Sequence, residues 1–292
     1  MSTLLRNALR RIWLCADDYG MAPGVNDAIR QLIERRRINA TSVMMAASHI
    51  GKDEVAALVA LNRKEPRAAL GLHVTLTAPF KPLSEGFAPL RGGAFLPHPA
   101  LMQAAMLRRL KPALLAIEIA AQLRAFTSAF GRPPDFVDGH QHVQLLPQVR
   151  DAFLRVVVEN APNAWVRQGG RARKARALHD RKGLVLDILS AGFRGRAEHF
   201  GLATNPAFAG AYIFSPKADF AGIFPRFLNG LPDGGLIMCH PGFVDDALKS
   251  LDPLTTLRER EFAYLNSDAH LDVLAAHNVA LAEPTGESPK AA

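Results

Sequence analysis

The stretch that decides the fold is residues 12–20, IWLCADDYG, in which a short apolar run ends in two adjacent carboxylates and a glycine. Continuous apolar runs of this length are typical of strands in a parallel sheet, because such strands are buried on both faces. A strand that only had to pack would not end in two charges that repel each other. We therefore expect a positive group beside Asp17 and Asp18, and a divalent metal ion is the simplest candidate.

Similar apolar runs alternate with helix-like patterns along the chain, which favours βα units and a mostly parallel sheet. The predicted strands are Ile12–Ala16, Thr41–Ala47, Ala69–Leu76, Phe136–Val143, Ala164–Arg167, Ala211–Phe214 and Gly235–Cys239, with a weaker eighth at Val279–Leu281. The predicted helices are Val25–Arg36, Asp151–Glu159, Leu184–Phe200 and Leu254–Asn266. Seven or eight such units predict an α/β fold, a distorted TIM-like (βα) barrel in a single domain over residues 1–282. An open doubly wound sheet is the alternative.

Three segments are expected to lie outside these units. Residues 79–99 are rich in proline and glycine and predict a long loop beside the site. Residues 205–210 predict a lid or a substrate-facing loop. The polar residues 283–292 predict a disordered tail.

Polar residues stand at the ends of four of the predicted strands. Asp17 and Asp18 follow the first strand, His73 and His140 lie late in the third and fourth, and His240 follows the last strong one. Sites in folds of this class form at the carboxyl ends of the strands. These five side chains are therefore expected to meet in space.

The fourth predicted strand carries Asp138, His140 and His142 at every second position. On a strand all three would face the same way, and burying them is costly unless they pair with each other or bind a metal. A His-x-His pair can supply two ligands to one ion, or one ligand and one group behind it. The spacing leaves both arrangements open.

The composition, with 49% hydrophobic and 21% charged residues, is that of an ordinary globular protein. No apolar run approaches the roughly 20 residues needed to cross a bilayer, and residues 1–11 lack the apolar core of a signal peptide. We therefore expect a cytoplasmic protein with no transmembrane segment. The two cysteines, Cys15 and Cys239, are too few for a disulfide scaffold and are expected to be buried free thiols.

The net charge of +8 is concentrated partly in residues 167–182. No aromatic residue falls between the cations of this segment, so no nucleic acid is expected as a partner. A solvated basic loop, or attraction of an anionic substrate or a membrane surface, stays open.

Four motifs, taken together, resemble those of the YdjC/ChbG-like carbohydrate deacetylases. They are ADDYG at 16–20, GLHVTLT at 71–77, DGHQHVQLLP at 138–147 and MCHPG at 238–242. They occur in that family's order and at about its spacing, from Ile12 to about Phe243. The chain departs from the usual pattern at Tyr19, where the family commonly has Phe, and at Gln144, where a further His often follows.

The resemblance implies a distorted barrel that removes an N-acetyl group from an amino sugar or an acetylated glycoconjugate. It implies that Asp18, His73 and His140 hold one divalent ion, either Mg²⁺ or Zn²⁺. Asp17 would be the general base on a metal-bound water and His240 the general acid. The family also suggests a homodimer.

Further residues are expected near the substrate. Arg167 ends its predicted strand and could meet the substrate or simply cap the strand towards water, and Phe208 could offer an apolar face to a sugar ring. Asp138 and His142 would contact the substrate or support the metal ligands. The remaining histidines are expected to be structural or on the surface: His49, His98, His179, His199, His270 and His277.

Two other functions stay open. One is a metal-dependent hydrolase of a phosphoester, with the basic segment attracting an anionic substrate. The other is a basic binding protein that has kept a degenerate barrel.

Overall fold

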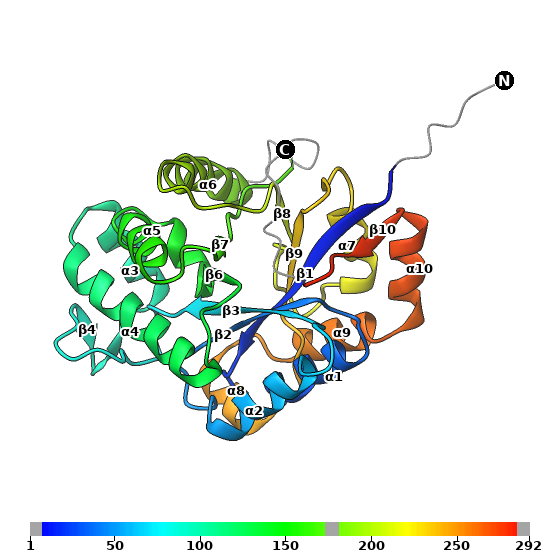
Figure 1. The fold of residues 1–292 in the computed structure, drawn as a ribbon, viewed down its shortest axis with the longest axis horizontal. Helices are drawn as coiled ribbons and strands as arrows, with labels where there is room; N and C mark the ends of the chain where they lie inside the picture. The colour runs from blue at the N-terminus through cyan, green and yellow to red at the C-terminus, as the bar shows by residue number, and fades with distance from the viewer. Residues whose placement is uncertain (1–7, 173–180, 285–292) are drawn as a thin grey trace.

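The computed structural model describes residues 8–172 and 181–284 of the chain (Figure 1). The strands are β1 (Arg10–Tyr19), β2 (Ala40–Val43), β3 (Ala69–Val74), β4 (Leu90–Arg91), β5 (Ala94–Phe95), β6 (Phe136–Gly139), β7 (Trp165–Val166), β8 (Phe208–Ala209), β9 (Leu236–Cys239) and β10 (Val279–Leu281). The helices are α1 (Pro23–Glu34), α2 (Lys52–Leu61), α3 (His98–Met106), α4 (Pro112–Phe130), α5 (Val149–Asn160), α6 (Arg181–His199), α7 (Phe220–Phe227), α8 (Asp246–Leu251), α9 (Thr256–Leu265) and α10 (Asp268–Ala276). A 3₁₀ helix, η1, covers His140–Leu145.

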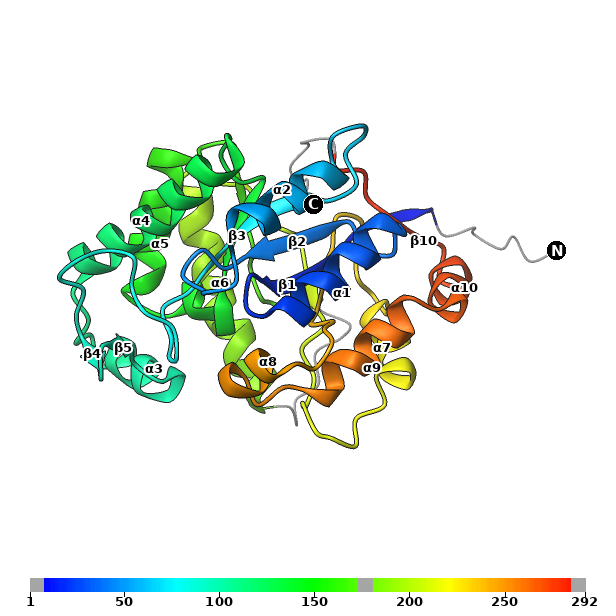
Figure 2. The ribbon, with the colours of Figure 1, turned by 90° about the horizontal axis from the view of Figure 1, so that it is seen from below.

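The main sheet is parallel and has the strand order β7-β6-β3-β2-β1-β9-β8, and β10 pairs with the start of β1. The two ends of this series are joined by single bridges from Val166 to Thr204 and from Arg171 to Phe208. The sheet therefore curls into the expected distorted barrel, and Figures 1 and 2 show the helices around its outside. The doubly wound alternative is wrong.

Strand side chains alternate between two apolar layers. The inner layer fills the barrel with residues from seven strands: Trp13, Cys15, Ala40, Ala69, Phe136, Trp165, Phe208, Leu236 and Met238. The rings of Phe136 and Trp165 stack in it with centroids 4.5 Å apart. The outer layer packs the opposite strand faces, such as Leu14 and Leu72, against the helices. This layering fixes which residue numbers point into the barrel.

Two sequence predictions of strands are wrong. The strand predicted at 136–143 ends at Gly139, because Gln141 and His142 have positive φ angles of 55° and 58° and the chain turns into η1. The strand predicted at 211–214 is absent, and β8 lies instead within residues 205–210, the segment expected to be a lid. Asn205 explains this: its buried amide accepts from the Gln168 backbone N–H and donates to the Gln168 carbonyl, which ties this segment to the end of β7.

The predicted loop at 79–99 contains the short hairpin β4–β5, and α3 begins at its end. The chain then enters α4, which the sequence did not predict. Among the described residues, α4 is the one helix whose length and hydropathy would suffice to cross a membrane. Its buried Glu118 and Gln122 bind the backbone of Ser84 and Thr75, so one face of α4 covers the barrel in the manner of a core helix. Residues 285–292 of the predicted tail lie outside the described residues.

Candidate active site and metal centre

The inward positions of the strands become polar at the carboxyl end of the barrel. Asp17, His73, Asp138, Arg167 and His240 each have the same parity as the inner apolar residues of their own strands. They therefore point into the barrel above that layer. The sheet brings together residues that are far apart in sequence, because its strands are parallel and all end at one side.

Asp18 should point outward by this alternation, but its backbone φ is +74°. A left-handed backbone conformation is unusual for residues other than glycine, and it interrupts the alternation of side chains along the strand. The pairing of β1 with β2 also shifts its register between Ala16 and Tyr19. Both neighbouring carboxylates consequently reach buried sites at this end of the barrel, where Asp17 binds Arg167 and Asp18 meets two histidines.

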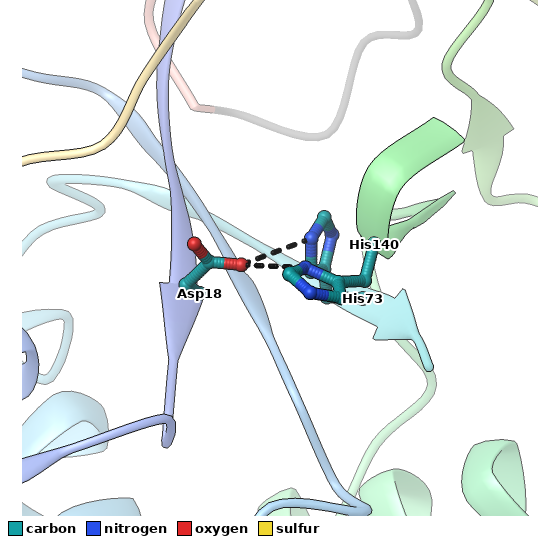
Figure 3. A group of neighbouring side chains, drawn as sticks. All are labelled: Asp18, His73 and His140. Atoms are coloured by element: carbon teal, nitrogen blue, oxygen red, sulfur yellow. Dashed lines mark hydrogen bonds and ion pairs between the residues drawn. The ribbon is translucent and has the colours of Figure 1, made fainter. Parts of the chain in front are cut away.

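Asp18, His73 and His140 form a buried group whose donor atoms could hold one metal ion (Figure 3). The Asp18 Oδ1 atom lies 3.0 Å from His140 Nδ1 and 3.4 Å from His73 Nε2. The three ligand atoms all lie within 4.8 Å of one another. One carboxylate oxygen and two imidazole nitrogens are three donor atoms of the kinds that catalytic divalent-metal sites use.

Asp138 orients His73 from behind. Its Oδ1 lies 2.5 Å from His73 Nδ1, and the Ser42 hydroxyl lies 3.0 Å from the same nitrogen. Holding Nδ1 in this way leaves Nε2 directed at Asp18, which is the usual arrangement behind a metal-binding histidine. Burial alone would lower the pKa of His73, but the Asp138 carboxylate beside it raises this pKa to about 10.

Arg167 forms a bidentate ion pair with Asp17. Its Nη1 donates to Oδ1 at 2.6 Å and its Nη2 donates to Oδ2 at 2.7 Å, and both side chains are buried. Burial would raise the pKa of Asp17, but the Arg167 guanidinium outweighs it and holds this pKa well below its usual range. Arg167 is buried, so the expectation that it caps the strand towards water is wrong, and its contact with a substrate stays a prediction.

Arg258 of α9 is a site residue that the sequence analysis missed. It is fully buried, and its Nη2 donates to Asp18 Oδ2 at 2.7 Å and to Asp252 Oδ2 at 2.5 Å. The second oxygen of Asp18 is therefore occupied, and only Oδ1 faces the two histidines. Gly242 of the MCHPG motif is close beside it, since an added Cβ there would lie 3.3 Å from Arg258 Cδ.

His240 follows β9, and its surroundings fix its backbone. Its N–H donates to the buried carboxylate of Glu261 at 2.5 Å, and Glu261 also accepts from the Tyr212 hydroxyl at 2.6 Å. The His240 ring meets Phe214 edge-on at 5.4 Å, and its buried Nδ1 has no hydrogen-bond partner among the described residues. An imidazole left free in this way is available for proton transfer.

His142 and Phe208 pack against each other, with ring centroids 5.4 Å apart. Phe208 has only 1% of its surface exposed and lies under the guanidinium of Arg167, so the expected apolar face towards a sugar is wrong. Burial, with the nearby Arg167 charge, lowers the pKa of His142 to about 3 and keeps its ring neutral. Because His142 lies in η1, the expected common strand face with Asp138 and His140 is also wrong.

The predictions for the cysteines and the remaining histidines have different outcomes. Cys15 and Cys239 are free and buried as expected, and burial raises the pKa of both thiols well above the usual value. His98 is half-buried, and burial, followed by the charge of His140, lowers its pKa. His270 is buried in an aromatic cluster, and His179 lies outside the described residues.

The basic segment at 167–182 is only partly described. Arg167 binds Asp17, and Arg171 lies 2.9 Å from Asp187. These two cations are therefore paired, and residues 173–180 lie outside the described residues.

The family profile described as "YdjC-like protein" matches residues 11–276 of the chain. The chain belongs to the YdjC-like family. A protein named chitooligosaccharide deacetylase from Yersinia enterocolitica is 27% identical over 237 residues, which cover 80% of this chain and 82% of that protein. A protein of the same name from Salmonella schwarzengrund is 28% identical over 236 residues, with the same coverage of both chains.

Solved structures show the same fold at lower identity. A crystal structure from Enterococcus faecalis, described as a "putative cellobiose-phosphate cleavage protein", has a TM-score of 0.71 at 19% identity and covers 96% of this YdjC-like chain and 100% of its own. A lactam utilization protein from Thermus thermophilus has a TM-score of 0.53 at 17% identity, covering 94% of this chain and 99% of its own. At these identities the similarity establishes the fold alone.

Proposed function

We propose that this YdjC-like protein is a metal-dependent carbohydrate deacetylase that hydrolyses the N-acetyl group of an amino sugar. The observation that carries the proposal is the convergence of Asp18, His73 and His140 beside a second, separately held carboxylate, Asp17. A metal hydrolase needs both a ligand set and an independent base. The relatives named chitooligosaccharide deacetylase supply the substrate class.

The residues fit a divalent ion. Two imidazoles and one carboxylate oxygen converge, and Asp138 holds His73 so that its Nε2 faces the group. A divalent ion bound there would polarise the amide carbonyl and make water acidic enough to attack near neutral pH. The donor set admits zinc, magnesium or manganese, and softness favours zinc.

The protein's own residues would carry the proton transfers. Asp17 accepts a proton from the attacking water, and Arg167 keeps that carboxylate ionised and fixed in orientation. His240 delivers a proton to the departing amine. One water and the N-acetyl sugar thus give acetate and the free amino sugar.

The phosphoester alternative lacks support in the described residues. It relies on the basic segment to attract an anionic substrate, but the two cations of that segment whose side chains are described, Arg167 and Arg171, are both paired with carboxylates. The cytoplasmic location and the homodimer remain predictions.

The test combines metal analysis with acetate release from N,N′-diacetylchitobiose. We expect about one divalent ion per wild-type chain and its loss in His73→Ala/His140→Ala. Asp17→Asn should retain the ion and lose about 10²- to 10⁴-fold in kcat, the usual contribution of a general base.

His199→Ala is the matched control, because His199 is exposed on α6, away from the three ligands. It should retain both metal and turnover. Unchanged turnover in Asp17→Asn would refute the assigned base, and a wild type that stays metal-free after reconstitution would refute the ligand set.

A further inference from the structure

The outer side of α3 and of the turn after it is apolar. Met102, Met106 and Leu107 expose 40%, 57% and 52% of their surfaces. Met102 and Met106 are four residues apart and therefore lie on one face of α3, about 100° around the helix from the buried Leu101 and Ala105. Helices on the surface of globular proteins normally present polar residues on such a face.

The next helix, α4, also exposes an apolar side chain. Its apolar residues Leu115, Ile119, Leu123 and Phe126 are buried in the core. Ile117, one turn and a half into the helix, is among the exposed large hydrophobic residues. Ile117 is the one large apolar residue of α4 that is exposed; the others are buried or pack against the core.

The stretch of chain that carries this surface has charges of one sign only. Residues 86–117 contain no Asp or Glu, whereas Arg91, Arg108, Arg109 and Lys111 are all exposed cations. Three of these four lie in the connection between α3 and α4, directly after the exposed Met106 and Leu107. None of them forms an ion pair among the described residues.

We propose that Met102, Met106 and Leu107, followed directly by the exposed cations Arg108, Arg109 and Lys111, form a docking surface for an anionic lipid bilayer. Apolar side chains on a helix face insert at the level of the headgroups, and neighbouring cations are attracted by anionic lipids. The surface combines both features in one short segment. The absence of carboxylates from residues 86–117 favours a uniformly anionic partner over a protein surface of mixed charge.

The segment that leads to the docking surface starts at the candidate site. The chain leaves the carboxyl end of β3, and Phe80 meets the His140 ring edge-on at 5.9 Å before the hairpin and α3 follow. The Phe95 N–H donates to the Phe80 carbonyl at 2.9 Å and anchors the hairpin there. Figures 1 and 2 show α3 and this hairpin together at the side of the molecule, beyond the barrel.

The test is co-sedimentation of the full-length protein with vesicles of phosphatidylcholine alone and of phosphatidylcholine with phosphatidylglycerol. The wild type should bind the anionic vesicles, bind the neutral ones weakly, and dissociate from the anionic ones as salt rises. Arg108→Glu/Arg109→Glu should weaken the binding at least about tenfold, since each cation near the surface contributes about a fivefold factor. Met106→Gln/Leu107→Gln should abolish the binding that survives at high salt.

Matched control variants make the same changes in charge and in exposed apolar residues, but outside α3 and the connection that follows it. Lys217→Glu/Arg226→Glu makes the same change in net charge, and Val185→Gln/Ile188→Gln removes two exposed apolar residues from α6. Both should bind nearly as the wild type does. The inference is overturned if the wild type ignores anionic vesicles, if the controls lose binding as much as the α3 variants, or if the surface instead forms a dimer that Met106→Gln/Leu107→Gln dissociates. None of these readouts depends on deacetylase activity.

Discussion

Replacing Arg167 with Met should expose how much the fold depends on the buried ion pair behind the candidate base. The substitution keeps most of the side-chain volume over Phe208 and removes the charge. It leaves Asp17, a buried carboxylate, without the two hydrogen bonds of 2.6 and 2.7 Å. Hydrogen bonds to charged groups contribute about 1.5–3 kcal/mol each, and breaking one partner of a buried pair costs about 3–5 kcal/mol. Because neither side chain is exposed, no solvent screening reduces this figure.

In Arg167→Met, the contribution of Asp17 to the free energy of unfolding should change with pH in the opposite direction from the wild type. In the wild type the pKa of Asp17 lies below its usual range, so the pair stabilises the fold above about pH 4 and loses this contribution as pH falls through the lowered value. Without Arg167, burial raises the pKa of Asp17 above that of the unfolded chain. The folded variant then binds more protons than the unfolded chain, and its stability falls as pH rises above about 4 until the raised pKa is passed.

The assay is thermal or denaturant unfolding of the wild type, Arg167→Met, Asp17→Asn and the double variant, each measured from pH 4 to neutrality. At neutral pH we expect Arg167→Met to lose about 3–5 kcal/mol and the double variant to recover part of it, because the unpaired charge is gone. The acid limb of kcat/KM should also move to higher pH in Arg167→Met. Equal losses in the single and double variants, with no change of pH slope, would refute the argument that Arg167 acts through Asp17.

Two further predictions concern the support of the site. Asp138→Ala should weaken metal binding about 10- to 100-fold in a calorimetric titration, because His73 loses the carboxylate behind Nδ1; an unchanged affinity would mean that Ser42 alone suffices. Gly71→Ala should destabilise the fold by about 1–3 kcal/mol, because the new Cβ would lie 2.4 Å from the buried Phe136 ring. Gly195→Ala is its control: a Cβ on that glycine of α6 meets nothing within 4 Å, so this substitution should stabilise the protein by up to about 1 kcal/mol. A smaller loss for Gly71→Ala than for its control would contradict the packing argument.

The sequence located the candidate site through local patterns. Apolar runs predicted β1, β3, β7, β9 and β10 near their actual positions, since burial on both faces leaves a signal in adjacent residues. The polar residues at the ends of these runs identified Asp17, Asp18, His73 and His240, which the parallel sheet does bring to one end. The motif at 138–142 was also found, although its backbone was predicted wrongly.

The errors arose where a long-range contact overrides the local pattern. Nothing within residues 205–210 marks a strand as short as β8, whose place depends on Asn205 binding Gln168 and on pairing with β9. The turn at η1 likewise escaped prediction, because residues with positive φ there are Gln and His rather than glycine. The helix α4 was missed because its apolar residues do not follow a clear one-sided period.

The sequence by itself determined the motifs, the barrel and the charged residues at the strand ends. These features depend on apolar runs and on the alternation of side chains along a strand, which are properties of neighbouring residues. Only the tertiary structure decided which carboxylate each cation binds. Arg167, expected to meet solvent or substrate, holds Asp17, and Arg258 reaches Asp18 from a helix 240 residues further along the chain. Such pairs leave no local signal, since Coulomb attraction and burial depend on distance in space and not on distance in sequence.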